Sequence, residues 1–218
     1  MERTQNLKKR LQLKRAGQTV WLIALFHLIG LIGLSFNVSR SLFLQLVPFH
    51  LLFMMVLIAS NHERINNKFF FFSALIFITG FTVEWIGVHT HFIFGDYWYG
   101  KTLGPKLDDI PVIIGLNWLM LIYSAGTLMQ QTRIKTMWLR VLTGTLILVL
   151  LDVVIEPVAV KFDYWHWADN FIPLKNYACW FIVSFVLLWV FEKFQFKKQS
   201  IAGAALLITE FVFFLALQ

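Results

Sequence analysis

The stretch that decides the fold runs from residue 138 to residue 156 and reads WLRVLTGTLILVLLDVVIE. Residues 141–151 within it carry no charge. A helix that crosses a bilayer needs about 20 mainly apolar residues, and in hydrocarbon the backbone must satisfy its own hydrogen bonds. The stretch therefore predicts a transmembrane helix. Its two acids, Asp152 and Glu156, lie near one end of that helix.

Six further stretches of the same kind occur along the chain. The seven predicted spans are residues 18–36, 41–60, 69–88, 111–129, 138–156, 174–192 and 201–217. No small-residue cleavage site follows the first span, so we expect an uncleaved helix rather than a signal peptide. The predicted fold class is all-α, a polytopic membrane helix bundle of about seven transmembrane helices. A single transmembrane domain of residues 18–218 would follow a basic head of residues 1–17.

The composition agrees with a membrane protein and excludes several other classes. Of the 218 residues, 58% are hydrophobic and 14% are charged, against about 45–50% and about 25% in soluble domains. A soluble globule of this size could not bury so much apolar surface, which excludes water-soluble enzymes, nucleic-acid binders and disordered chains. The single cysteine, Cys179, excludes an internal disulfide framework and a cysteine-rich metal site.

The basic residues predict the orientation in the membrane. The head, together with the loops near residues 61–68, 130–140 and 192–199, holds 14 of the 19 Lys and Arg residues, and the opposite side holds 5. Because short cytoplasmic loops are enriched in Lys and Arg, we expect a cytoplasmic N-terminus and an outside C-terminus. The net charge of +7 is then a topology signal that contacts anionic membrane lipids, and no nucleic acid is expected as a partner.

Two long loops, residues 89–110 and 157–173, fall on the predicted outer side and resemble each other. One contains FGDYWY at residues 94–99 and the other FDYWHW at residues 162–167. Each loop ends in Ile-Pro, and a tryptophan follows seven residues after each proline. The pattern predicts a parallel repeat of residues 69–129 and 138–192 about an axis normal to the membrane. A chance match is the alternative. A true repeat would place a site between its two hairpins.

Four acids fall inside the predicted spans, while no Lys or Arg lies deep in any span. They are Glu84, Asp152, Glu156 and Glu210. Ionisable groups in a bilayer are expensive and by default suggest a functional site. Removal from water disfavours the charged form of a carboxyl group, and an acid that stays protonated at neutral pH can act as a general acid. The alternative role is structural, namely hydrogen bonding between helices.

Other motifs carry less information. The His89 and His91 pair near Asp96 could in principle bind a metal, but interfacial hydrogen bonding explains one such pair better, and no metal is expected. The clustered histidine boxes of membrane di-iron oxygenases are absent. Residues 200–218 contain no lysine for a retinal Schiff base, which excludes a rhodopsin.

Several separated motifs, in order, resemble the integral-membrane carotenoid biosynthesis family. The resemblance covers about residues 80–182. In the first half the motifs are EWIGVHT at 84–90, FGDYWY at 94–99, LGPKL at 103–107, Ile110-Pro111 and Trp118. In the second half they are Asp152, Glu156-Pro157, YWHW at 164–167, Pro173, Asn176-Tyr177 and Trp180.

This resemblance implies a carotenoid hydratase, which adds water to the terminal C=C of an acyclic (ψ) end group such as that of lycopene or γ-carotene. The product is a tertiary alcohol, made without a cofactor. The implied catalytic residues are Asp152, Glu84 and Glu156. The implied substrate-binding residues are Trp85, Asp96, Tyr97, Tyr99, Trp118, Trp165, Trp167, Asn176 and Trp180. The expected location is the bacterial cytoplasmic membrane. The expected partners are the carotenoid in the bilayer, membrane lipids and other enzymes of the carotenoid pathway.

Three alternatives stay open at this point. A membrane lycopene cyclase would use the same protonation and then close a ring, although the Pro-x-Glu-Glu/Asp motif of that group is absent here. A proton-coupled transporter would use unpaired intramembrane acids, but it needs acids staged across the membrane. A pigment-binding protein without catalysis would need the aromatic residues and not the acids.

Overall fold

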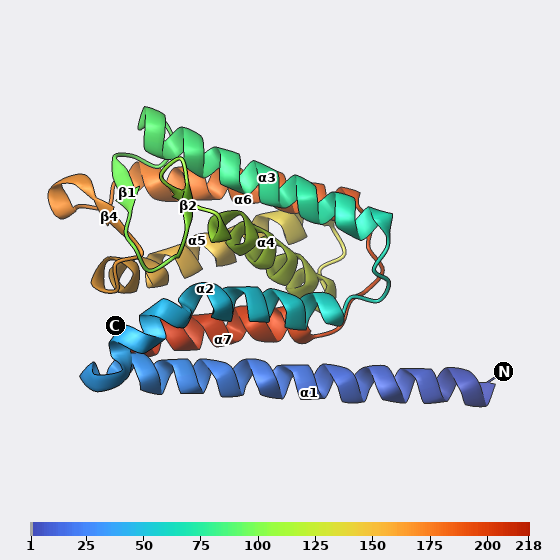
Figure 1. Ribbon diagram of the computed structural model, residues 1–218. Helices are drawn as coiled ribbons and strands as arrows, with labels where there is room; N and C mark the ends of the chain where they lie inside the picture. Colours follow the sequence, from blue (N-terminus) through green and yellow to red (C-terminus); the bar gives the residue numbers. More distant parts are fainter. Residues whose placement is uncertain (1) are drawn as a thin grey trace.

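The computed structural model describes residues 2–218, with side chains from residue 10 onwards. This part of the chain forms seven α-helices, which confirms the all-α bundle (Figure 1). The helices are α1 (Glu2–Ser35), α2 (Asn37–Ser60), α3 (Asn67–Thr90), α4 (Ile113–Gln131), α5 (Met137–Lys161), α6 (Leu174–Lys193) and α7 (Ala202–Leu217).

Six of the seven helices in the described residues are long and apolar enough to cross a membrane. The seventh, α7, is also apolar, but at 16 residues it is shorter than the others. Helix α1 continues through residues predicted to form a separate basic head, so the head and the first span are one helix. The two ends of the chain lie at opposite ends of the bundle (Figure 1).

Helix α4 is the centre of the bundle. It contacts α2, α3, α5, α6 and α7, and most of its side chains are buried. Helix α1 lies on the outside, where it packs against α2 and α7 (Figure 1). Of the two hairpins in the predicted repeat, one pairs α3 with α4 and the other pairs α5 with α6. Helix α4 thus lies between α3, α5 and α6 on one side and α2 and α7 on the other, and α1 lies outside α2 and α7.

Helix α5 runs past its predicted end. The sequence placed this end at Glu156, before Pro157, but the helix continues to Lys161 with the proline inside it. Proline removes one backbone donor, a loss that is tolerated where neighbouring groups satisfy the freed carbonyl. The backbone N–H groups of Phe162 and Tyr164 then donate to Val158 and Ala159 and turn the chain out of the helix.

Within residues 2–218 the structure also contains four short strands, which the sequence did not predict. They are β1 (Tyr97–Tyr99), β2 (Lys106–Leu107), β3 (Ile110–Pro111) and β4 (Trp165–Trp167). The β1 strand pairs antiparallel with β4, and β2 pairs antiparallel with β3. The first pair joins the two long loops at the end of the bundle that also holds the C-terminus (Figure 1).

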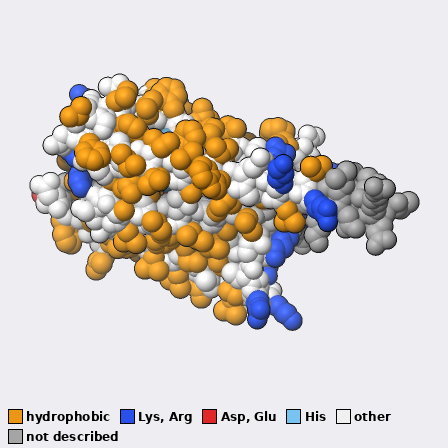
Figure 2. Space-filling model, turned by 90° about the horizontal axis from the view of Figure 1, so that it is seen from below, with side chains coloured by type: hydrophobic (Ala, Val, Ile, Leu, Met, Phe, Trp, Pro, Cys, Tyr) orange, Lys and Arg blue, Asp and Glu red, His pale blue; other side chains and the backbone are white. Residues whose placement is uncertain are grey.

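The surface of the bundle is apolar over most of its extent. Figure 2 shows hydrophobic side chains covering the face seen from below, while most of the Lys and Arg side chains on that face gather toward one end. Exposed leucine, isoleucine, valine or phenylalanine side chains occur on every helix except the central α4. A bundle with this surface is suited to lipid contact, in agreement with a multi-pass membrane protein.

Gly80 brings α3 close to α4 at Trp118. A Cβ atom added at Gly80 would lie 2.5 Å from the Cβ of Trp118, and the Trp118 side chain is almost completely buried. We expect Gly80→Ala to lower the free energy of unfolding by about 1–3 kcal/mol, as overpacking does. Thermal unfolding in detergent measures the change.

The matched control is Gly17→Ala on exposed α1, where nothing lies within 4 Å of an added Cβ. This change should leave the protein unchanged or slightly more stable, because alanine favours a helix over glycine. Equal effects of the two substitutions would contradict the close approach of α3 and α4.

Candidate active site

Glu84 on α3 is a buried carboxylate surrounded by hydrogen-bond donors. The hydroxyl groups of Tyr97 and Tyr99 donate to its Oε2, each at 2.7 Å. The indole Nε1 of Trp118 donates to its Oε1 at 2.9 Å. Both oxygens therefore act as acceptors, which is the role of an ionised carboxylate. Three donors compensate for the absence of water around this group.

Glu156 on α5 has an equivalent set of three donors. The indole groups of Trp165 and Trp167 donate to its Oε2 at 3.0 and 2.8 Å. The side-chain amide of Asn176 donates to its Oε1 at 3.1 Å and also to Oδ2 of Asp152 at 2.8 Å. One amide thus bridges two acids that lie one helical turn apart on α5. The other oxygen of Asp152, Oδ1, is buried without a hydrogen-bond partner among the described residues.

The β1–β4 strand pair delivers four of these six donors. Side chains alternate between the two faces of a strand, and Tyr97 faces Trp167 while Tyr99 faces Trp165 in the register. These four side chains share the face that meets Glu84 and Glu156. Burial raises the pKa of the Tyr97 and Tyr99 hydroxyls far above the usual value. The negative charge of nearby Glu84 raises both pKa values further. Both therefore remain protonated donors.

The opposite face of the strand pair is held by Asp163. His166 hydrogen-bonds to Asp163 Oδ1 at 2.7 Å, and the backbone N–H of Lys101 donates to Oδ2 at 3.0 Å. The hydrogen bond with His166 is the main cause that lowers the pKa of Asp163 below its usual value, and the hydrogen bond from the Lys101 backbone lowers it further. On this face the ring of Trp98 stacks on that of His166. Asp163 therefore fastens the second loop to the first, which fixes the position of β1 against β4.

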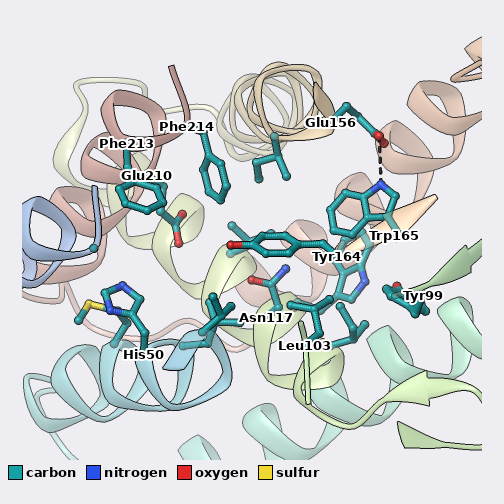
Figure 3. Close-up of a pocket in the computed structure, with 18 of the residues that line it drawn as sticks. His50, Tyr99, Leu103, Asn117, Glu156, Tyr164, Trp165, Glu210, Phe213 and Phe214 are labelled. Atoms are coloured by element: carbon teal, nitrogen blue, oxygen red, sulfur yellow. Dashed lines mark hydrogen bonds between the residues drawn. The ribbon is translucent and has the colours of Figure 1, made fainter. Parts of the chain in front are cut away.

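A cavity of about 380 Å³ lies beside the two carboxylates. Its lining includes Glu84, Glu156, Tyr97, Tyr99, Trp118, Trp165, Trp167, Asn176 and Trp180. Figure 3 shows Glu156, Trp165 and Tyr99 at one end, Tyr164 and Asn117 in the middle, and Glu210 and His50 at the other end. We call the end that holds Glu84 and Glu156 the carboxylate end, and the end that holds Glu210 and His50 the Glu210 end.

Aromatic faces dominate the carboxylate end. The rings of Trp118 and Trp180, one from each predicted repeat, stack with centroids 4.4 Å apart. The rings of Tyr97 and Trp167 lie 5.2 Å apart across the strand pair. Such faces attract positive charge by cation–π interaction. This end therefore combines two carboxylates with π faces, an arrangement that stabilises a cation in an apolar space.

Three residues predicted for the site lie outside the cavity lining. Asp152 is buried behind Glu156 and reaches the cavity only through Asn176. Trp85 is partly exposed and donates its indole N–H to Asp108. Asp96 lies on the surface 3.1 Å from His91.

The two histidines of the His-x-His pair contact different acids. His91 lies beside Asp96, whereas His89 gathers with Asp108 and Asp109, with one possible ligand atom from each of these three within 4.8 Å of the others. All three side chains of this group are exposed. The pair therefore does not form one site.

Sequence reasoning omitted several lining residues from the site. His27 and His50 line the cavity and lie within apolar spans. An ionisable residue inside a membrane span by default suggests a functional site, so the reasoning that selected the four acids also applies to these two histidines. Glu210 was recognised as an intramembrane acid but was not assigned to the site, although it lines the same cavity. Asn117 and Tyr164 also line it. Tyr164 lies in the YWHW motif, whereas no local pattern in the sequence distinguishes Asn117.

Comparison with known proteins gives two matches. A family model described as "Carotenoid biosynthesis protein" matches residues 44–218. A protein of Haloarcula japonica named bisanhydrobacterioruberin hydratase is 28% identical over 137 residues, which cover 59% of this chain and 46% of the relative. The chain thus spans less than half the length of that relative. No solved structure matches the chain.

A double-mutant cycle tests the donor set of Glu84. We expect Glu84→Gln and Tyr99→Phe each to lower the stability, because each leaves a buried polar group with a missing or mismatched partner. Their coupling energy should be about 1–3 kcal/mol, since both remove one interaction. Reversible unfolding in detergent micelles measures it.

The control cycle pairs Glu84→Gln with Trp98→Phe. The Trp98 side chain lies on the other face of β1 and is half exposed, so these two changes should add within about 0.5 kcal/mol. Additive behaviour of Tyr99 with Glu84 would contradict the hydrogen bond between them.

Proposed function

The chain belongs to the carotenoid biosynthesis protein family, and on this premise we propose that it is a carotenoid hydratase. It adds water to the terminal C=C of an acyclic end group and forms a tertiary alcohol. The observation that carries the proposal is the pair of buried carboxylates, Glu84 and Glu156, that face one apolar, aromatic cavity. The similarity to a protein named as a hydratase supports this reaction type.

The substrate reaches the cavity sideways from the bilayer. Phe26 and Ile29 of α1 and Leu46 and Phe49 of α2 line the cavity and are also exposed on the surface of the bundle. The cavity therefore opens where the bundle faces lipid. Its volume of about 380 Å³ lies in the range of small-molecule sites, about 300–1,000 Å³. An end group occupies it, while the polyene extends into the membrane.

Asp152 and Glu156 supply the proton. Two carboxyl groups bridged by one amide cannot both be ionised at low cost, because like charges repel strongly out of water. The pair therefore shares a proton, and Oδ1 of Asp152, which accepts no hydrogen bond, is the oxygen on which a negative charge would cost most. Glu156, the member that lines the cavity, passes the proton to the CH carbon of the terminal C(CH₃)₂=CH group. The π electrons of the double bond form the new C–H bond.

Protonation leaves a tertiary cation at the carbon that carries the two methyl groups. The faces of Trp118, Trp180 and Trp167 stabilise it by about 2 kcal/mol each when desolvated. The carboxylate of Glu84 adds electrostatic stabilisation. A water molecule then forms the C–O bond, and Glu84 takes its surplus proton. The proton returns to the Asp152–Glu156 pair before the next turnover, so that one alkene and one water give one alcohol.

The location in the bacterial cytoplasmic membrane, with the N-terminus inside, is part of the same proposal. The excess of Lys and Arg in the head and in alternate loops supports it. In this orientation the strand pairs and the carboxylate end lie near the outer surface, on the side of the C-terminus.

Co-expression in a bacterium that makes lycopene or γ-carotene tests the reaction. We expect a more polar pigment whose mass has increased by one water, because hydration adds H and OH across the double bond. Chromatography with mass spectrometry measures it. A pigment of unchanged mass and altered absorption would indicate cyclisation instead. An unchanged pigment with every acyclic substrate would contradict both reactions.

Asp152→Asn tests whether the Asp152–Glu156 pair supplies the proton. Asparagine cannot supply a carboxylic proton, so the hydrated pigment should fall to below about 1% of the wild-type amount, a loss of at least about 10²-fold, which is the lower end of the contribution of general acid catalysis. The variant protein should remain in the membrane at its normal level. The control is Asp169→Asn in the outer loop, which lies outside the cavity lining and should leave the product unchanged. Normal turnover by Asp152→Asn would remove this residue from the reaction.

A further inference from the structure

The Glu210 end of the cavity holds a second group of polar side chains, to which the proposed reaction assigns no task. Glu210 comes from α7, His27 from α1 and His50 from α2, and all three line the cavity. In Figure 3 the labelled Glu210 and His50 lie at the end opposite Glu156 and Trp165. The ring of His27 packs against those of His50 and of Phe213 on α7, so the histidines lie at the same end of the cavity as Glu210, near the lipid-facing surface of α1 and α2.

Glu210 lacks the donors that satisfy the other two cavity acids. Its side chain is 6% exposed, and its Oε2 is fully buried without a partner. Within residues 10–218, no group hydrogen-bonds to either of its oxygens. In folded proteins about 90% or more of buried polar groups have a hydrogen-bond partner. An unpartnered carboxyl group that lines a cavity therefore points to a partner supplied by the cavity's occupant.

The two histidines add unused hydrogen-bonding capacity beside Glu210. His27 Nδ1 lies 2.8 Å from the backbone carbonyl of Ile23, and because a carbonyl can only accept, this nitrogen carries the hydrogen. The Nε2 of neutral His27 is then left as an acceptor. The ring of His50 lies edge-on to that of His27, with centroids 4.7 Å apart. Among the described residues, no group forms a hydrogen bond with His50.

The remaining surroundings of this cluster are apolar. The ring of Phe213 packs edge-on against His27, and Phe26 packs against Phe53; all three phenylalanines line the cavity. An occupant of this end must therefore be mostly hydrocarbon with a single hydrogen-bonding group. A hydroxyl group both donates and accepts, which suits a carboxyl group beside an acceptor nitrogen. A carboxylate would be repelled by Glu210 when that group is ionised.

We propose that Glu210, with His27 and His50, forms a subsite that binds a hydroxyl group carried by the isoprenoid ligand. The preferred substrate is thus an acyclic isoprenoid that is already oxygenated, with its terminal double bond at the carboxylate end. The choice of an isoprenoid rests on the proposed function, whereas the hydroxyl preference rests on the cluster itself.

The family match begins at residue 44. It includes the carboxylate end, built from residues 84–180, and also His50 and Glu210 of the other end. His27 and Phe26 of α1, which complete the Glu210 end, lie before it.

Binding of short isoprenoids to the purified protein in detergent tests the subsite. Geraniol, farnesol and geranylgeraniol carry the same terminal double bond at one end and a hydroxyl group at increasing distances from it. Each alcohol is compared with the hydrocarbon in which hydrogen replaces the hydroxyl group. Quenching of tryptophan fluorescence reports binding, because Trp118, Trp165, Trp167 and Trp180 line the cavity. We expect one chain length to bind about tenfold more tightly as the alcohol, the effect of one good hydrogen bond.

Two substitutions of Glu210 separate recognition from folding. Glu210→Leu removes a buried carboxyl group that has no partner and adds no new unpaired polar group, so the fold should persist. The alcohol and the hydrocarbon should then bind equally. Glu210→Gln keeps the shape and two hydrogen-bonding atoms and should retain most of the preference.

Two results would overturn the subsite. One is a wild-type protein that binds the alcohol and the hydrocarbon equally at all three lengths, in which case the cluster holds only water. The other is a Glu210→Leu variant that keeps the wild-type preference. The binding assay needs no turnover. A protein that prefers the alcohol but never hydrates a carotenoid would therefore retain this subsite and lose the proposed function.

Discussion

The rest of the structure depends on the cost of burying a carboxylate where no water can reach it. Glu84 and Glu156 are both buried, and each requires several donors to remain there. The helices of the bundle supply only one donor to each, from Trp118 and from Asn176. The other four come from β1 and β4. The two long loops therefore form strands, pair with each other and close one end of the bundle, because only this arrangement brings both sets of donors to the acids.

The bundle itself followed from the hydrophobic pattern, since seven apolar stretches in a bilayer permit little other than seven helices. The pattern could not show that α5 continues through Pro157, because that depends on neighbouring groups in space. Glu84 and Glu156 were predicted because they are ionisable residues inside apolar spans. The residues that donate to them were predicted to bind substrate, from the family resemblance, and their role as donors was not predicted. The strand pairing was missed because segments of three residues carry no periodicity of their own. Asp152 was predicted to be catalytic, and the sequence did not show that it lies outside the cavity lining, where Asn176 connects it to Glu156.

Under the proposed function, the cavity separates two tasks. At its carboxylate end both Glu84 and Glu156 have three hydrogen-bond donors, which suits charge stabilisation at fixed positions. Its Glu210 end has unused hydrogen-bonding atoms, which suits recognition of a group on the ligand. Helix α1 contributes to the second end and not to the hydrogen bonds of the first. Changes in α1 and α7 could then alter the choice of substrate without disturbing Glu84 or Glu156.

The central claim is that this chain adds water to a carbon–carbon double bond by proton transfer. Isotope incorporation by the purified protein, supplied with an acyclic carotenoid in labelled water, tests this claim most directly. With deuterated water enriched in heavy oxygen, the account predicts a product that contains one solvent oxygen at the tertiary carbon and one solvent deuterium at the neighbouring carbon. A product that lacks the solvent oxygen, either because it has cyclised or because its oxygen comes from dioxygen, would contradict the account.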